Sequence, residues 1–148
     1  MNPLFSMRPA TLADKAFADG LLFMTMHEYV EATWPNNRHA HQQYYKLNSF
    51  DPMNTRILLM DNRDIGRLST TKRADCIFID ELHILPEYQG LRIGTSAIEA
   101  VIQEAREAGL PVKLMVLTVN PAYRLYLRMG FRVIAEEDHR FHMEYAQT

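Results

Sequence analysis

The sequence predicts one α/β domain with a mixed sheet, and three observations lead to this fold class. Short apolar or β-branched segments alternate with helical patterns along 148 residues, a length typical of one domain. No repeat, low-complexity tract or linker divides the chain. With 47% hydrophobic residues and a net charge of −2, the composition is that of an ordinary globular protein. The predicted order, over residues 1–148, is β-α-α-β-β-β-α-β-α-β-β.

The N-terminal part predicts one strand and two helices. Pro3–Pro9 is short and apolar, and Thr11–Asp14 has the spacing of a capping box, which opens a helix. Apolar positions continue this helix to about Tyr29, and the segment 34–37, with Trp-Pro-Asn-Asn, interrupts it. A second helix is expected over Arg38–Leu47.

The next segments predict a hairpin, a long strand and an amphipathic helix. Arg56–Met60 and Ile65–Thr70 flank a polar turn, as in a β-hairpin. Cys76–Leu85 is an apolar strand that carries an acidic pair and ends at a proline. Apolar residues at helical spacing follow from about Arg92 until Gly109. The last expected elements are the strand Val112–Val119, the short helix Pro121–Met129 and the strands Phe131–Ala135 and Phe141–Tyr145.

Composition also limits the location and the partners. The single cysteine, Cys76, cannot form an intrachain disulfide, and the N-terminus lacks the charged start and apolar run of a signal peptide. The apolar stretches are far shorter than the roughly 20 residues that cross a bilayer. The near-neutral charge lacks the basic excess of most nucleic-acid binders. We therefore expect a cytoplasmic protein with no nucleic acid and no membrane among its partners.

A glycine-bearing turn is the most informative motif. Glu87–Thr95 lies between the end of the long strand and the start of the amphipathic helix. Unpaired N–H groups and the positive end of the helix dipole make such a turn a binder of phosphate or pyrophosphate. It matches neither the dinucleotide fingerprint nor the P-loop. By itself, the pattern also fits a plain strand-to-helix connection.

A second motif gives the turn a more specific meaning. Val119–Phe131 leaves a buried strand and opens a short helix, with Asn120 at a capping position. Together the two motifs resemble the GCN5-related N-acetyltransferase (GNAT) family, over nearly the whole chain. The family's pyrophosphate loop, Q/R-x-x-G-x-G/A, is matched by Gln89 to Gly94. Its later block, N-x-A-x-x-L-Y-x-x-x-G-F, is matched by Asn120, Ala122, Leu125, Tyr126, Gly130 and Phe131.

The resemblance implies a GNAT fold, with a mostly antiparallel sheet flanked by helices, and acetyl-CoA as the acyl donor. The donor would lie where two parallel strands splay apart, with its pantetheine arm pairing with the backbone near Ile84 and Leu85. Asn120 would contact the pantetheine. The pyrophosphate would meet the amides of Gln89, Gly90, Leu91, Arg92, Ile93, Gly94 and Thr95.

Arg92 departs from the family pattern, because the family usually has the central glycine of the loop at this position. A Cβ tolerates fewer backbone conformations than glycine does and prevents the closest approach to a phosphate. An arginine at a helix start can itself pair with a phosphate of the cofactor. We expect weakened or re-posed binding of acetyl-CoA.

The resemblance also implies catalytic roles. In the family, a tyrosine at the Tyr126 position protonates the departing thiolate; the alternative is a helical aromatic packed in the core. The attacking amine must lose a proton, and family members carry an acidic residue at the Asp80 position. Asp80 is the first candidate for the base, and Glu81 is a second base or an anchor for the substrate amine. His83, on the same face as Glu81, ranks third, because a lone strand histidine is more often a core residue.

The segment 27–48, rich in aromatics and histidines, would line the acceptor pocket by the same resemblance. Its histidine spacing does not fit a zinc site, so we expect no metal. Cys76 carries no nucleophile motif, which favours direct transfer from thioester to amine over a covalent acyl-enzyme.

The predicted function is acetyl transfer from acetyl-CoA to a primary amine. The acidic pair and the net negative charge favour a small cationic acceptor, such as a polyamine, an amino-acid derivative or an aminoglycoside, over an acidic one. A protein amine stays open as the acceptor. The alternative function is a non-catalytic sensor or interaction module that binds acyl-CoA. Homodimers through sheet edges or C-terminal strands, which are frequent in the family, are also compatible with the sequence.

Overall fold

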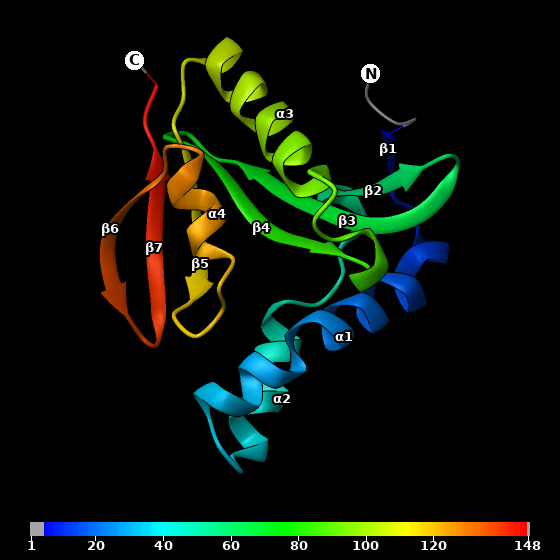
Figure 1. The fold of residues 1–148 in the computed structure, drawn as a ribbon, viewed down its shortest axis with the longest axis vertical. Helices are drawn as coiled ribbons and strands as arrows, with labels where there is room; N and C mark the ends of the chain where they lie inside the picture. Colours follow the sequence, from blue (N-terminus) through cyan, green and yellow to red (C-terminus); the bar gives the residue numbers. More distant parts are fainter. Residues whose placement is uncertain (1–4, 148) are drawn as a thin grey trace. The chain divides into compact units, whose positions relative to one another are not determined.

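The computed structural model describes residues 5–147 and shows the predicted order of helices and strands (Figure 1). Pro3 and Leu4, with which the first strand was expected to begin, lie outside the described residues. Three 3₁₀ turns, η1 (Leu12–Asp14), η2 (Pro52–Asn54) and η3 (Pro86–Tyr88), accompany the regular elements. These are β1 (Phe5–Pro9), α1 (Lys15–Thr33), α2 (Arg38–Leu47), β2 (Thr55–Met60), β3 (Arg63–Lys72), β4 (Ile77–Ile84), α3 (Ile93–Ala108), β5 (Val112–Leu117), α4 (Tyr123–Arg128), β6 (Arg132–Glu137) and β7 (Arg140–Tyr145).

The helix boundaries follow the local signals, with two differences. The Asp14 carboxylate accepts a hydrogen bond from the Thr11 amide at 2.9 Å, so the predicted capping residues do open this helical segment. Helix α1 continues to Thr33, beyond the predicted Tyr29, because nothing disfavours helix until Trp34, which precedes a proline. The short helix α4 begins at Tyr123 rather than Pro121.

Hydrogen bonds order the seven strands as β1-β2-β3-β4-β5-β7-β6. The pairs β1–β2, β2–β3, β5–β7 and β6–β7 are antiparallel, whereas β4 and β5 are parallel. The sheet is therefore mixed and mostly antiparallel, as predicted. The β4–β5 register runs from Ile77 opposite Val112 to Ile79 opposite Leu114 and covers only the first three residues of β4.

The chain forms two compact units. Unit 1 comprises the chain up to Ser69 together with Glu81–Gly94, and unit 2 comprises Thr70–Asp80 and the chain from Thr95 onwards. In unit 1, apolar side chains of α1, β2 and β3 make the core: Ala18, Leu21, Leu22, Val30, Ile57, Leu58, Ile65 and Leu68. In unit 2, the core is built by the predicted apolar face of α3 and by β5 and β7: Ala97, Ile98, Val101, Ala105, Val112, Leu114 and Met143.

Within residues 5–147, no helix combines the length and apolar character required to cross a bilayer.

Candidate active site

The acidic pair of β4 points to opposite faces of the strand, as its adjacency predicts. Burial alternates along β4, so Glu81 and His83 share the buried face, while Asp80 lies on the other face. Glu81 is 8% exposed and His83 is 9% exposed. Both are therefore buried polar groups, which require hydrogen-bond partners.

Glu81, His83 and Thr25 form a chain of hydrogen bonds within unit 1. The Nε2 atom of His83 lies 2.7 Å from Oε1 of Glu81, and its Nδ1 atom lies 3.1 Å from the Thr25 hydroxyl on α1. Thr25 Oγ1 also donates to the Leu21 carbonyl at 2.9 Å in one orientation of its hydroxyl. Thr25 could not be predicted from the sequence, because no local motif relates a helical threonine to a strand 58 residues away.

Arg67 on β3 is a second buried polar residue that no sequence motif indicates. Only 1% of it is exposed, and its Nη1 donates to the Ala18 carbonyl at 3.2 Å. In the described part of the chain, its Nε has no hydrogen-bond partner. Burial lowers the pKa of the Arg67 guanidinium, and the negative charge of Glu81 partly opposes this shift. A buried cation on the same side of the sheet as Glu81 is thus part of this site.

The predicted pyrophosphate loop is exposed at Gln89, Gly90, Leu91 and Arg92. Gly90 has a φ of 77°, and Arg92 has a φ of 65°, so both lie in the left-handed region. Arg92 therefore adopts the backbone conformation that a glycine would supply, with the strain that a Cβ adds there. Ile93 then starts α3. The effect of Arg92 on acetyl-CoA binding stays a prediction.

The backbone before this loop is already hydrogen-bonded. The Gln89 side chain donates to the Ile84 carbonyl at 2.9 Å, and the Leu85 amide donates to the Ile65 carbonyl at 2.8 Å. Gly66 on β3 lies close to this part of β4, because a Cβ at Gly66 would come within 2.6 Å of the His83 carbonyl oxygen. Close packing of β3 on β4 therefore fixes the end of β4 where the resemblance places the pantetheine arm.

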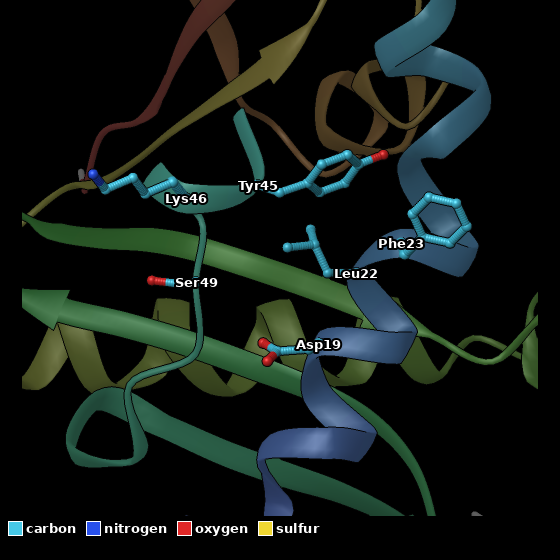
Figure 2. A pocket seen from close by; sticks show the side chains of 6 residues that line it. All are labelled: Asp19, Leu22, Phe23, Tyr45, Lys46 and Ser49. Atoms are coloured by element: carbon cyan, nitrogen blue, oxygen red, sulfur yellow. The ribbon is translucent and has the colours of Figure 1, made fainter. Parts of the chain in front are cut away.

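A cavity of about 360 Å³ lies in unit 1 beside α1 and α2 (Figure 2). Phe23 stacks on His27, with ring centroids 5.0 Å apart, and lies 5.8 Å from the Tyr45 ring. Burial raises the pKa of the Tyr45 hydroxyl. The Asp19 carboxylate is 2.7 Å from the Lys15 ammonium. The lining consists of Asp19, Leu22, Phe23, Tyr45, Lys46 and Ser49.

The cavity overlaps only partly with the predicted acceptor segment, residues 27–48. Tyr45 and Lys46 lie within that segment, but four of the lining residues lie outside it. His41 faces the Trp34 carbonyl at 2.7 Å and Glu31 at 3.2 Å, so it bridges α1 and α2. That histidine therefore has a structural contact that the sequence pattern did not reveal.

Unit 2 holds the remaining predicted site residues. Asp80 is partly buried and accepts a hydrogen bond from the Thr71 hydroxyl at 2.7 Å. Burial raises the pKa of the Asp80 carboxyl, although the Thr71 hydrogen bond opposes the shift. Thr95 lies in the first turn of α3.

Tyr126 and Asn120 lie near the short helix α4. Tyr126 is 8% exposed, and its ring packs edge-on against Phe131, with centroids 5.8 Å apart. Asn120 Oδ1 accepts a hydrogen bond from the Ala122 amide at 2.9 Å. Ala122, not Asn120, is the N-cap of α4, so Asn120 stabilises the turn before the helix.

The described residues contain no group of three or more His, Cys, Asp or Glu side chains able to hold a metal ion. Cys76 is a buried free thiol, and burial raises its pKa. A buried thiol with a raised pKa is a poor nucleophile, because the thiolate is the reactive form.

The structure has an exposed glycine-bearing loop between β4 and α3 and carries Tyr126 on a short helix after β5. This fold and these motifs are those of an acetyl-CoA-dependent N-acetyltransferase. The chain matches the model of the Acetyltransferase (GNAT) family over residues 23–131, well over half of its length. It belongs to this family, as the two sequence motifs predicted. The predicted acyl donor, acetyl-CoA, is thereby confirmed, since related structures hold CoA or acetyl-CoA. No curated protein matches the chain.

Solved structures share the fold at low sequence identity. PaiA N-acetyltransferase from Thermoplasma acidophilum, in complex with coenzyme A, superposes with a TM-score of 0.78 at 17% identity, covering 99% of this chain and 100% of that one. Ard1 from Thermoplasma volcanium has a TM-score of 0.69 at 14% identity, covering 97% of this chain and 99% of that one. N-acetylglutamate synthase from Neisseria gonorrhoeae, complexed with coenzyme A and N-acetyl-glutamate, has a TM-score of 0.68 at 16% identity, covering 97% of this chain and 35% of that one.

Proposed function

We propose that the protein acetylates the primary amine of a small cationic acceptor by direct attack on acetyl-CoA in a ternary complex. The observation that carries the acceptor class is the cavity of unit 1, whose lining includes the Asp19 carboxylate and the rings of Phe23 and Tyr45. A carboxylate attracts an ammonium group, and aromatic faces attract cations and apolar carbon chains. Figure 2 shows the Lys46 ammonium directed away from Asp19. The Asp19 carboxylate already pairs with the exposed Lys15 ammonium at 2.7 Å, so an acceptor cation would compete with Lys15 for it.

The donor side of the proposal rests on the loop after β4. The pyrophosphate of acetyl-CoA would be bound by the amides of the loop and the start of α3, where two left-handed residues shape the turn. The Arg92 side chain is exposed and adds a positive charge at this place. The proposed donor-binding residues are Ile84, Leu85, Gln89, Gly90, Leu91, Arg92, Ile93, Gly94, Thr95 and Asn120.

The proposed chemistry moves two protons off the acceptor nitrogen and one onto the sulfur. The acceptor ammonium loses its first proton to a carboxylate of β4, for which Asp80 and Glu81 are the candidates. The free amine nitrogen attacks the thioester carbonyl carbon, the C–S bond breaks, and the sulfur takes a proton from the Tyr126 hydroxyl. The nitrogen then loses its second proton, which restores the Tyr126 hydroxyl, and the carboxylate releases the first proton to solvent. An amine with a pKa near 10 is mostly protonated at neutral pH, so the first transfer is required for attack. Burial of the Cys76 thiol supports transfer without an acyl-enzyme.

Isothermal titration with acetyl-CoA, followed by a thiol-release assay over a panel of amines, tests this function. The panel contains polyamines, amino-acid derivatives, aminoglycosides and a peptide with a free N-terminus. Turnover of cationic small amines, lowered in Asp19→Asn through a higher KM for the amine, is the expected result. Turnover of the peptide and of no small amine would mean that the acceptor is a protein amine and not a small cationic amine. Binding of acetyl-CoA with no turnover of any amine would favour the alternative, a non-catalytic sensor of acyl-CoA.

A further inference from the structure

The lining of the unit 1 cavity carries charges of both signs. Asp19 lies on α1, Lys46 lies in the last turn of α2, and Ser49 follows that helix. In Figure 2, Lys46 and Ser49 lie at one end of the lining and Phe23 lies at the other, with Leu22 and Asp19 between them. A cavity of this kind distinguishes ligands by the charges that they carry.

The Asp19 charge is already balanced within the protein. Its carboxylate pairs with the Lys15 ammonium at 2.7 Å, and Lys15 lies one turn earlier on α1. The buried guanidinium of Arg67 interacts with the same charge through space. Asp19 alone therefore does not make the cavity negative, and a ligand with ammonium groups only would compete with Lys15 for it.

Lys46 and Ser49, which we name the positive end of the cavity, have no such balance. No carboxylate of the described residues lies within ion-pair distance of the Lys46 ammonium. Within residues 5–147, the Ser49 hydroxyl makes no hydrogen bond. The Ser49 amide donates to the Lys46 carbonyl at 3.4 Å, so one turn of backbone carries both side chains. A carboxylate supplies acceptor oxygens for an ammonium and a hydroxyl together.

The rest of the lining is apolar or aromatic. Leu22 is buried, and the rings of Phe23 and Tyr45 lie 5.8 Å apart. Such a surface fits the carbon chain between the charged ends of a small ligand. We infer that the acceptor carries a carboxylate besides its amines, that the positive end binds this carboxylate, and that the acceptor is a basic amino acid rather than a polyamine or an aminoglycoside. This inference rests on the proposed acetyl transfer and narrows its small cationic acceptor to one chemical class.

A basic amino acid has two amines and one carboxylate, and it meets both signs of charge in the lining. Its carboxylate binds Lys46 and Ser49, one ammonium takes the place of Lys15 at Asp19, and the other amine is acetylated. The Lys15 side chain is 64% exposed, so its displacement into water costs little.

Matched amines test the role of the carboxylate. Free L-lysine, its carboxamide and 1,5-diaminopentane share a carbon chain with two amines, and only free lysine carries a carboxylate. We expect the wild type to have a KM for lysine about tenfold below that for either other amine, which is the scale of one hydrogen bond to a charged group. The difference should shrink as salt screens the exposed ammonium of Lys46.

Variants of the positive end assign this preference to its two residues. Lys46→Met removes the charge and Lys46→Arg keeps it. Lys72→Met is the matched control, because Lys72 is also exposed but lies at the end of β3 in unit 2. We expect the preference for lysine to disappear in Lys46→Met and to fall several-fold in Ser49→Ala. It should persist in Lys46→Arg and Lys72→Met, and the KM for acetyl-CoA should not change in any of the four.

Two results would overturn the inference. One is an equal KM for lysine and 1,5-diaminopentane in the wild type. The other is a preference for lysine that survives Lys46→Met, or that Lys46→Met and Lys72→Met lower equally, because the carboxylate would then bind elsewhere.

A measurement without turnover separates the inference from the proposed function. Coenzyme A has no acetyl group to donate, so the amines can be titrated at equilibrium in its presence. Tighter binding of lysine than of its carboxamide, lost in Lys46→Met, is the expected result. If this holds while no amine is acetylated, the proposed function fails and the ligand class stands. If polyamines are acetylated and lysine binds no more tightly than they do, or does not bind, the function stands and the inference fails.

Discussion

Nε2 of His83 lies 2.7 Å from Oε1 of Glu81, and the two residues are i and i+2 on the buried face of β4. Side chains at this spacing point the same way from a strand, so the contact follows from the pleat once the strand is placed. The contact satisfies one polar atom of each buried side chain, so the replacement of either residue leaves the other without this hydrogen bond.

Tyr126→Phe tests the proposed acid. The substitution removes only the hydroxyl and keeps the ring that packs on Phe131. We expect kcat to fall about 10²-fold, because the departing thiolate loses its proton donor, while titration gives an unchanged Kd for acetyl-CoA. Tyr123→Phe, on the same helix with its hydroxyl beside Arg124, is the control. Equal losses of turnover and of affinity would remove Tyr126 from the acid role.

Arg92→Gly should stabilise the protein and weaken the binding of acetyl-CoA. With a φ of 65°, Arg92 is strained, and a glycine relieves about 1 kcal/mol of this strain. Loss of the exposed cation should raise the Kd several-fold at low salt, and the difference should shrink as salt screens the phosphate. Arg92→Asn is the control, because Asn tolerates the same φ without the charge. An unchanged Kd in both variants would show that the arginine makes no contact with a phosphate.

The fold could be predicted from the sequence because its signals are local. The apolar spacing of α3, the turn formers between β2 and β3, and Gly109 after α3 each act within a few residues. The loop and the acidic pair were also found, since both occupy contiguous positions. The contacts of Thr25 with His83 and of Arg67 with the Ala18 carbonyl could not be predicted, because the partners lie on other elements. Asp19 and Phe23 also line the cavity, although both lie outside the segment 27–48 that its aromatic content indicated. Their place could not be predicted for the same reason, because the cavity is formed by residues of different elements.

Asp80→Asn should change how stability depends on pH. Burial raises the pKa of Asp80 above the unfolded value of 3.8, so the folded state binds the proton more tightly. The neutral carboxyl therefore favours folding at pH below 3.8, and this contribution is lost as pH rises through the raised pKa. At neutral pH, Asn avoids the burial of a charge, so we expect Asp80→Asn to be more stable than the wild type. Urea unfolding at several pH values measures this, and the gain should vanish at low pH.

Thr71→Val tests the hydrogen bond that opposes the raised pKa of Asp80. Thr71→Val removes the hydroxyl that donates to Asp80 at 2.7 Å and stabilises its ionised form. The pKa of Asp80 should rise further, and the wild type should exceed the variant in stability mainly at neutral pH. A difference that is constant from low to neutral pH would instead indicate loss of packing.

Gly66→Ala should destabilise unit 1 by about 1–3 kcal/mol, because the new Cβ would have to displace backbone. It would lie 2.6 Å from the His83 carbonyl oxygen and 3.2 Å from Cδ1 of Leu58. Gly20→Ala is the control: no atom lies within 4 Å of its Cβ position on α1, so alanine should stabilise that helix by about 0.5–1 kcal/mol. Opposite shifts of the urea midpoint are expected. Equal midpoints would mean that β3 and β4 separate at little cost, and the end of β4 would then lack the rigid support that holds the Glu81–His83 pair.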